Sequence, residues 1–261
     1  MMNPAEFANI AALEEHFWWF RGMRRILFHL LDPLADRGGL VLEAGCGTGH
    51  LSRMLEQRYG WRMVPVDLAR EGLDYGRGLG VTRMVQADIA ALPFRSDAFD
   101  AVLSMDVIVH FPRGSEQQAF SELTRVLKPG GLMVVRVSAL DILRSRHSDF
   151  ARERQRFTRP RLLEQARRNG LRVMRCTFAN SLLMPVALAK FRLYEPFLKG
   201  PLESGVRPVA GWLDRLLHQA LAMEAAWLGR GRDLPFGQSL ILIAGKPLYT
   251  DKSEAPAAPR G

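Results

Sequence analysis

From residue 40 onward, short runs of apolar and β-branched residues alternate with stretches that carry apolar residues at helical spacing. The runs that read as strands cover residues 40–44, 62–67, 83–88, 99–104 and 131–137. Between the last two, residues 117–128 form a helical pattern that Pro129 and Gly130 stop. Strands that alternate with helices pair in parallel, so the pattern predicts a doubly wound, Rossmann-like α/β sheet.

The segments outside this alternating region complete the expected organisation. Residues 171–177 and 239–244 read as a sixth and a seventh strand, and about 55 residues of helical patterning lie between them. We therefore expect an N-terminal helical lid (1–38), an α/β core (39–178), a helical cap inserted before the last strand (179–235), the final strand (236–249) and a flexible tail (250–261).

Composition excludes several classes of protein. The hydrophobic share of 48% over 261 residues is that of a globular core and not of a disordered chain. Cys46 and Cys176 are too few for a disulfide framework or a cysteine-rich metal site, and no metal is expected. No run reaches the roughly 20 apolar residues of a membrane span, and no signal pattern opens the sequence. We expect a cytoplasmic protein, with peripheral contact to the inner membrane face left open.

The net charge of +9 is concentrated in one segment, because residues 144–175 carry 11 arginines against three acidic residues. A solvated arginine-rich helix and loop would explain this segment, and so would an acidic acceptor or an anionic membrane surface. An amphipathic helix with a basic face could follow it. Its residues are Met184, Ala187, Leu188, Lys190, Phe191, Arg192, Leu193, Tyr194, Phe197, Leu198 and Lys199.

A glycine-rich turn directly follows the first strand. It reads Glu43-Ala44-Gly45-Cys46-Gly47-Thr48-Gly49. Glycines without a Cβ let the backbone approach a nucleotide closely. Their spacing differs from that of the dinucleotide fingerprint, and the preceding acid would repel a phosphate while suiting a cationic ligand such as an amino group.

Two further acids close the second and third strands. Asp67 could accept both hydroxyls of a ribose, and Asp88 could accept a hydrogen bond from an adenine amine. Leu68 and Ile89 would supply apolar faces against the purine. Each aspartate alone is typical of a helix N-cap, but acids at three strand ends share the carboxyl edge of the sheet, where ligands bind in such folds.

As an ordered set, these motifs resemble the class I S-adenosylmethionine-dependent methyltransferases, and more closely the methyltransferase type 11 group that includes the ubiquinone-biosynthesis type. The matching segments are residues 41–49, 66–67, 86–94, 99–100 and 127–131, and the flanks at 15–20, 155–158, 179–185 and 234–240 resemble a bacterial subgroup. The resemblance implies a seven-stranded sheet whose last strand runs antiparallel, with S-adenosylmethionine as cofactor and S-adenosylhomocysteine as product.

The resemblance also implies roles for the matched positions. Glu43 with Gly45, Cys46, Gly47 and Gly49 would hold the methionine end, Asp67 the ribose, and Asp88 with Ile89 the adenine, while Ser104 would line the methyl-donor side.

Residues outside the cofactor motifs supply the candidates for catalysis and acceptor contact. His110, beyond the fourth strand, is the candidate general base, with a positional role as the alternative. Arg21 or Arg24 could pair with the cofactor carboxylate. The tentative acceptor-contact residues are Trp18, Trp19, His147 and Arg156; the two tryptophans would close over the site or simply pack on the sheet.

Three classes of function follow. The favoured class is a methyltransferase for a small or amphipathic acceptor, which could be acidic or lipid-linked. The second is an RNA methyltransferase that uses residues 144–175 as a phosphate track, but residues 104–107 lack the motif of base-amine methyltransferases, so nucleic acid is disfavoured. The third is a non-catalytic cofactor-binding protein. The acceptor atom and the oligomeric state stay open.

Overall fold

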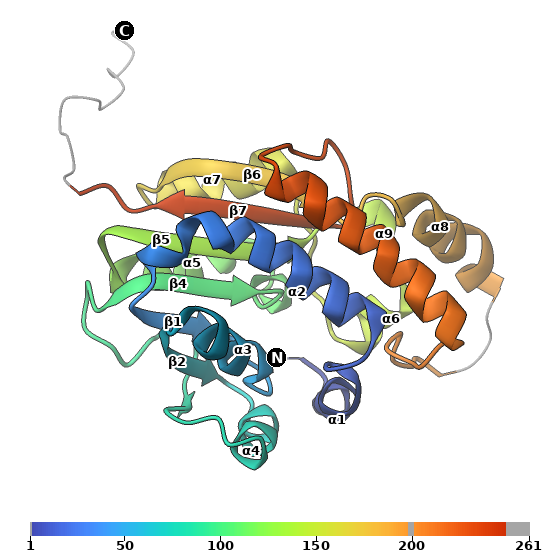
Figure 1. The fold of residues 1–261 in the computed structure, drawn as a ribbon, viewed down its shortest axis with the longest axis horizontal. Coiled ribbons are helices and arrows are strands. Elements are labelled where there is room, and N and C mark those ends of the chain that lie inside the picture. Colours follow the sequence, from blue (N-terminus) through green and yellow to red (C-terminus); the bar gives the residue numbers. More distant parts are fainter. Residues whose placement is uncertain (1, 198–200, 249–261) are drawn as a thin grey trace, which may run out of the picture.

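The computed structural model describes residues 2–197 and 201–248. Across these residues, seven strands form one sheet in the order β3-β2-β1-β4-β5-β7-β6 (Figure 1). The strands are β1 (Leu40–Ala44), β2 (Arg62–Asp67), β3 (Val85–Gln86), β4 (Phe99–Met105), β5 (Leu127–Ser138), β6 (Arg172–Ala179) and β7 (Ser239–Gly245). Strand β7 runs antiparallel to both neighbours, and the other pairs are parallel. The predicted seven-stranded Rossmann-like sheet is confirmed.

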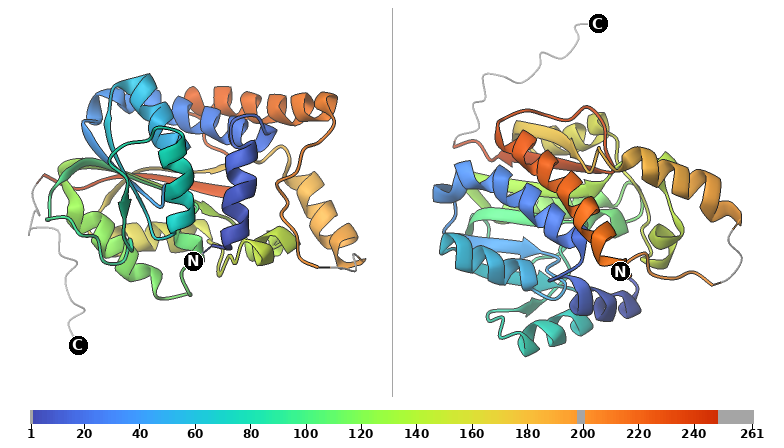
Figure 2. Two further views of the ribbon diagram at one scale, coloured as in Figure 1. Left: turned by 90° about the horizontal axis from the view of Figure 1, so that it is seen from below. Right: turned by 45° about the vertical axis from the view of Figure 1, so that its right-hand side comes forward.

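Helices cover both faces of the sheet (Figures 1 and 2). They are α1 (Pro4–Leu13), α2 (Trp18–Leu31), α3 (His50–Tyr59), α4 (Arg70–Gly78), α5 (Glu116–Val126), α6 (Arg146–Phe150), α7 (Arg159–Arg168), α8 (Met184–Ala189) and α9 (Gly211–Gly229). One core lies between the sheet and helices α2, α3 and α9, and the other between the sheet and helices α5 and α7. Helices α1 and α4 lie side by side at the carboxyl edge of the sheet (Figure 2).

Some elements differ in length from the sequence-based prediction. The N-terminal region expected as a helical lid (1–38) contains the two separate helices α1 and α2, because the chain turns after Leu13 and Phe17 adopts an extended conformation. Phe17 is 8% exposed, so the turn buries its ring. Strand β3 is shorter than the expected 83–88, since Arg83 has a left-handed φ of 59° that interrupts extended pairing.

The inserted segment between β6 and β7 contributes a helix to the main body. Helix α9 packs along α2 over the front face of the sheet (Figure 1). The backbone N–H of Trp18 donates to Asp214 Oδ1 at 3.0 Å, and a Cβ on Gly22 would lie 2.3 Å from Leu221 Cδ1. The glycine therefore permits the close approach of the two helices, and α9 belongs to the helical layer of the core.

The strand order places the candidate site. Strand β1 lies between β2 and β4, so the chain leaves the first strand in one direction and returns on its other side. Open α/β sheets bind ligands in the crevice at such a switch point, beyond the carboxyl ends of the strands. None of the helices in the described part of the chain is long and apolar enough to cross a bilayer.

Candidate functional site

The glycine turn after β1 is held by its neighbours on both sides. Gly45, Gly47 and Gly49 have φ values of 84°, 55° and 71°, a region that side chains with a Cβ rarely adopt. The N–H groups of Gly45 and Cys46 donate to the carbonyl of Val66 at 2.7 and 2.8 Å. A Cβ on Gly45 would lie 2.1 Å from Val107 Cγ2, so the turn packs directly against the loop after β4.

Glu43, the last residue but one of β1, is a buried carboxyl, 2% exposed. Its Oε2 accepts a hydrogen bond from the hydroxyl of Ser52 at the start of α3. Burial raises the pKa of Glu43 to about 8, and the nearby Asp67 and Glu14 carboxylates push it in the same direction. A cationic ligand would compensate for this burial, because a positive charge nearby favours the ionised carboxylate. The site therefore fits an ammonium or sulfonium group.

Asp67 ends β2 beside the same turn. Its Oδ2 accepts from Gly47 N–H and its Oδ1 from Ala69 N–H, both at 2.8 Å. Burial raises the pKa of Asp67, while these two backbone donors act in the opposite direction. The carboxylate is thus fixed in orientation, and each oxygen has a further lone pair for a ligand hydroxyl.

The two residues expected at the adenine lie differently. Asp88 is exposed, two residues beyond β3, and its Oδ1 accepts from Ala90 N–H at 2.9 Å. Ile89 is 4% exposed and packs in the core beneath it, whereas Leu68 is 41% exposed. The structure therefore brings Glu43, Asp67 and the glycines together, and it places Asp88 toward the β3 edge of the sheet.

Ser104 lies within β4 and is fully buried. Its Oγ has no hydrogen-bond partner among the described residues. A buried hydroxyl without a partner is uncommon in folded proteins and is consistent with a site where a ligand or a water supplies the missing bond.

His110 lies in the short helix η2 (Ile108–His110) after β4. Its Nδ1 is 3.2 Å from the carbonyl oxygen of Arg152, and a carbonyl can only accept, so Nδ1 carries the proton. Burial lowers the pKa of His110, which favours the neutral imidazole. Nε2 then has a free lone pair, which is the state that a general base requires.

The N-terminal candidates separate into two groups. The backbone of Trp18 bonds to Asp214, and Arg21 pairs with the same carboxylate at 3.0 Å, so both stabilise the α2–α9 contact. Trp19 instead lies over the guanidinium of Arg136, 5.3 Å from it, and Arg136 pairs with Asp106 just beyond β4 at 2.6 Å. Of the two tryptophans, Trp19 is the one linked to the strand ends.

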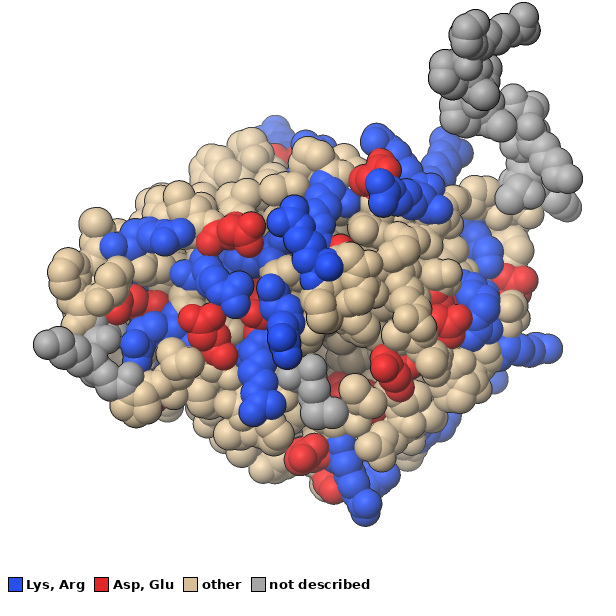
Figure 3. All heavy atoms as spheres, turned by 180° about the vertical axis from the view of Figure 1, so that it is seen from behind, with Lys and Arg blue, Asp and Glu red and all other residues tan. Residues whose placement is uncertain are grey.

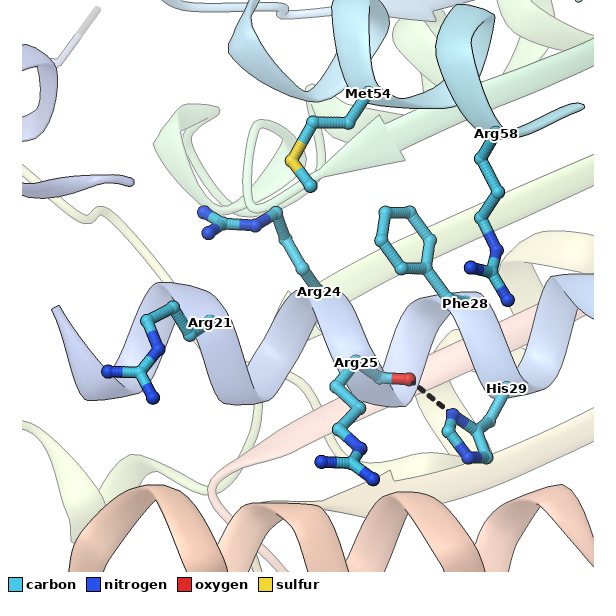
Figure 4. A pocket seen from close by; sticks show the side chains of 7 residues that line it. All are labelled: Arg21, Arg24, Arg25, Phe28, His29, Met54 and Arg58. Carbon is cyan, nitrogen blue, oxygen red and sulfur yellow. Dashed lines mark hydrogen bonds between the residues drawn. The ribbon is translucent and has the colours of Figure 1, made fainter. Parts of the chain in front are cut away.

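Arg21 and Arg24 line a basic surface pocket of about 280 Å³ between α2 and α3 (Figure 4). The other lining residues are Arg25, Phe28, His29, Met54 and Arg58. Arg24 donates to the backbone carbonyls of Glu14 and Glu15, and burial lowers its pKa. These arginines therefore have partners within the protein, and a contact to the cofactor stays a prediction.

His147 and Arg156 are both bonded within the protein. Nδ1 of His147 accepts from Gly205 N–H at 3.0 Å, and burial lowers its pKa. Arg156 pairs with Glu153 at 3.1 Å and donates to the carbonyl of Ala139 at 3.1 Å. The guanidinium of Arg156 also donates to Ser148 Oγ of α6 at 2.9 Å, so it connects α6 to the residue that follows β5. A contact between Arg156 and an acceptor stays a prediction.

Much of the arginine-rich segment is similarly paired, although basic side chains are prominent on the rear face (Figure 3). The arginines of this segment that pair with carboxylates include Arg144, Arg156, Arg161, Arg168 and Arg175. Arg161 pairs with the buried Glu116 and stacks on Phe157, 4.3 Å from its ring centre. Part of the segment's charge therefore stabilises the fold.

Helix α1 supplies site residues that sequence reasoning missed. Phe7 is 2% exposed, and a Cβ on Gly47 would lie 3.9 Å from its ring, so the ring covers the glycine turn. Glu14, at the end of α1, accepts from the hydroxyl of Thr48 at 2.7 Å, and burial raises its pKa to about 7. The only signal in the sequence was the apolar spacing of α1, which does not reveal its partner.

Comparison with known proteins identifies the region that holds this site. Residues 42–135 match the methyltransferase domain family Methyltransf_11. These residues are therefore similar to a methyltransferase domain. The matched region contains the glycine turn, Asp67 and His110.

The relatives differ in how much of this chain and of their own length the match covers. The methyltransferase GfsG of Streptomyces halstedii is 28% identical over 86% of this chain and 80% of its own length. The human "Probable tRNA methyltransferase 9B" is 35% identical over 40% of this chain, which spans only 22% of that relative's length. Further relatives are named as methyltransferases of malonyl-[acyl-carrier protein], sterols and a phytyl hydroquinone.

Solved structures share the fold. A chain of the complex between the Haloferax volcanii Trm112 methyltransferase activator and a methyltransferase superposes with a TM-score of 0.57 at 20% identity. The match covers 93% of this chain and 98% of that one, so it includes the helices that flank the core.

Proposed function

We propose that this protein transfers a methyl group from S-adenosylmethionine to a small or amphipathic acceptor. The observation that carries the proposal is the buried carboxyl of Glu43 beside the glycine turn and Asp67, at the switch point of the sheet. A buried acid with a raised pKa fits a positively charged ligand, and the fixed Asp67 fits a diol.

When bound, the cofactor would supply an electrophilic methyl group for in-line displacement. The residues of this chain would hold and orient the reactants: Glu43 at the amino-acid end and Asp67 at the ribose. His110, with Nε2 unprotonated, would take the proton of an acceptor hydroxyl or amine. Phe7 would exclude water from the glycine turn.

A small or amphipathic acceptor agrees with the pairing of several arginines of residues 144–175 within the protein, which leaves fewer of them for a phosphate track. The named relatives act on acceptors of several kinds, so they support methyl transfer without selecting an acceptor. Membership in the ubiquinone-biosynthesis type stays a prediction.

Calorimetry tests the cofactor. The intact protein should bind S-adenosylmethionine, and Asp67→Ala should weaken binding by at least tenfold, because each lost hydrogen bond from a charged group is worth about 1.5–3 kcal/mol. Asp74→Ala, an exposed acid on α4, is the matched control. Absence of binding by the intact protein would refute the proposal.

The acceptor class is tested separately. Cell extract incubated with the protein and methyl-labelled cofactor is fractionated into lipid, RNA and small molecules. We expect label in the lipid or small-molecule fraction. Label confined to RNA would contradict a small or amphipathic acceptor and would indicate an RNA methyltransferase instead.

A further inference from the structure

An exposed apolar stripe follows strand β6. Helix α8 continues into the π-helical turn η4 (Lys190–Tyr194) and the 3₁₀ turn η5 (Glu195–Phe197), at one end of the molecule (Figure 1). The large apolar side chains on it are among the most exposed of the described residues: Val186 66%, Leu193 72%, Tyr194 60% and Phe197 80%. Intervals of seven, eight and eleven residues from Val186 place them on one side of a helix.

The other side of the segment is anchored to the protein. Glu195 is 9% exposed and accepts from the backbone N–H of Arg146 at 2.8 Å. Arg192 Nε donates to the carbonyl of Ile142 at 2.8 Å, and α8 also packs against the turn that contains Ile142. The segment is therefore fixed with its apolar stripe directed outward. Exposing these side chains to water costs free energy, and exposed apolar patches of this kind are typical of surfaces that bind a partner or a membrane.

Positive charge accompanies the stripe. Lys190 is exposed four residues from both Val186 and Tyr194, so it lies on the same side, and the exposed Arg192, bonded to Ile142 through Nε, adds a second positive charge to the segment. The carboxylate of this segment, Glu195, is turned inward. Residues 144–175, with a net charge of +8, begin beside the segment, and basic side chains extend from this end across the rear face (Figure 3).

Large apolar side chains with basic side chains beside them are complementary to the headgroup region of an anionic bilayer. The rings and aliphatic groups can enter this region, and the anionic lipids attract lysine and arginine. We propose that residues 184–197 form an interfacial docking surface that binds the protein peripherally to membranes containing anionic lipid. The proposal does not depend on the methyl-transfer reaction, because only exposure and charge enter into it. Leu198 and Lys199, expected in the same helix, lie outside the described residues.

Vesicle co-sedimentation of the full chain tests this surface. We expect binding to mixed phosphatidylcholine–phosphatidylglycerol vesicles at low salt, and much weaker binding to pure phosphatidylcholine. Leu193→Asp with Phe197→Asp should weaken binding at least tenfold, because two large apolar side chains would no longer enter the interface. Lys190→Glu should weaken binding by more than about fivefold, since each basic residue near an anionic surface contributes roughly 1 kcal/mol.

Met223→Asp is the matched control, because Met223 is 60% exposed on α9, outside the segment. It should bind vesicles like the unaltered protein, and all variants should keep its thermal unfolding midpoint. Failure of the unaltered protein to sediment with anionic vesicles would overturn the proposal, as would equal binding to neutral vesicles. The protein could instead fail to bind vesicles and form a dimer by light scattering that the Leu193 and Phe197 substitutions dissociate. That result would assign the stripe to contact with a second copy of the chain.

Discussion

At the scale of single residues, the site is a set of acids whose environments differ. Glu43 and Glu14 are buried with pKa values raised to about 8 and about 7, whereas Asp67 is held by two backbone N–H groups. The first two disfavour their own ionisation until a cation arrives. In the proposed site, burial as well as direct contact would therefore favour a positively charged ligand.

Glu43→Gln should have opposite effects on the stability of the fold and on cofactor binding. In the folded protein Glu43 keeps its proton up to about pH 8, whereas the unfolded chain releases it near 4.5, so its contribution to stability decreases as the pH rises through that window. The amide should raise the unfolding midpoint more at the upper end of the window than at the lower end, and should weaken cofactor binding. Thermal unfolding near pH 4.5 and near pH 8 measures the change in midpoint, and calorimetry measures cofactor binding. An equal shift of the midpoint at the two pH values would contradict the prediction.

His110→Ala should lower turnover by about 10²-fold or more while leaving cofactor binding within about twofold. Because burial lowers the pKa of His110 below the usual histidine value of 6.5, the rate of the intact enzyme should fall only at pH values below 6.5. That acidic limb should be missing in the variant. Full turnover by His110→Ala would leave the residue with a positional role only.

At the scale of elements, α1 is a cover over the glycine turn. Phe7 lies over the glycine turn, and Glu14 bonds to Thr48 within it. Helix α1 packs on α4 and lies apart from the two main cores, so it can open locally without unfolding the sheet.

Phe7→Ala should release this cover. Loss of a buried phenylalanine costs about 3–5 kcal/mol, and here it should lower the free energy that holds α1 against the glycine turn. Hydrogen exchange should show lost protection over residues 4–13 with the sheet protected as before, and the cofactor should dissociate faster. Ala12→Ser, exposed on the same helix, is the control. Loss of protection throughout the sheet would mean that α1 unfolds together with the core.

The elements also show how far sequence reasoning reaches. Strand β1, the glycine turn and Asp67 follow from local pattern, because β-branched runs and glycine spacing are determined within a few residues. The partner of Arg21 could not be predicted, since Asp214 lies 193 residues away and no periodicity connects them. The same holds for Glu14, which becomes part of the site only through the fold of α1 over Thr48.

At the scale of the whole molecule, the N-terminal region and the segment before the last strand form one layer. Helices α2 and α9 share the Trp18–Asp214 and Arg21–Asp214 bonds and the close contact at Gly22. Leu221, Ala225 and Leu228 are buried in the same core as Ile26 and Leu30. The region expected to be only a cap thus also completes the hydrophobic core.

Gly22→Ala should destabilise the protein by about 1–3 kcal/mol, because the added methyl group would overlap Leu221. Combined with Leu221→Ala, the double variant should lose less than the sum of the two single losses. Urea unfolding measures all three. Gly211→Ala, on α9 with no atom near its Cβ position, should be close to neutral. Additive losses would show that the two helices are not tightly packed at this point.

The pairing of α2 with α9 has a consequence for synthesis on the ribosome. The apolar side of α2 emerges early, but its partner follows only after nearly 200 further residues, which take roughly 10–40 s at about 5–20 residues per second. Until then one face of the nascent sheet stays exposed to water. The sheet of this chain should therefore finish folding only after α9 has been made, and the nascent chain before that point is the form that most needs a chaperone.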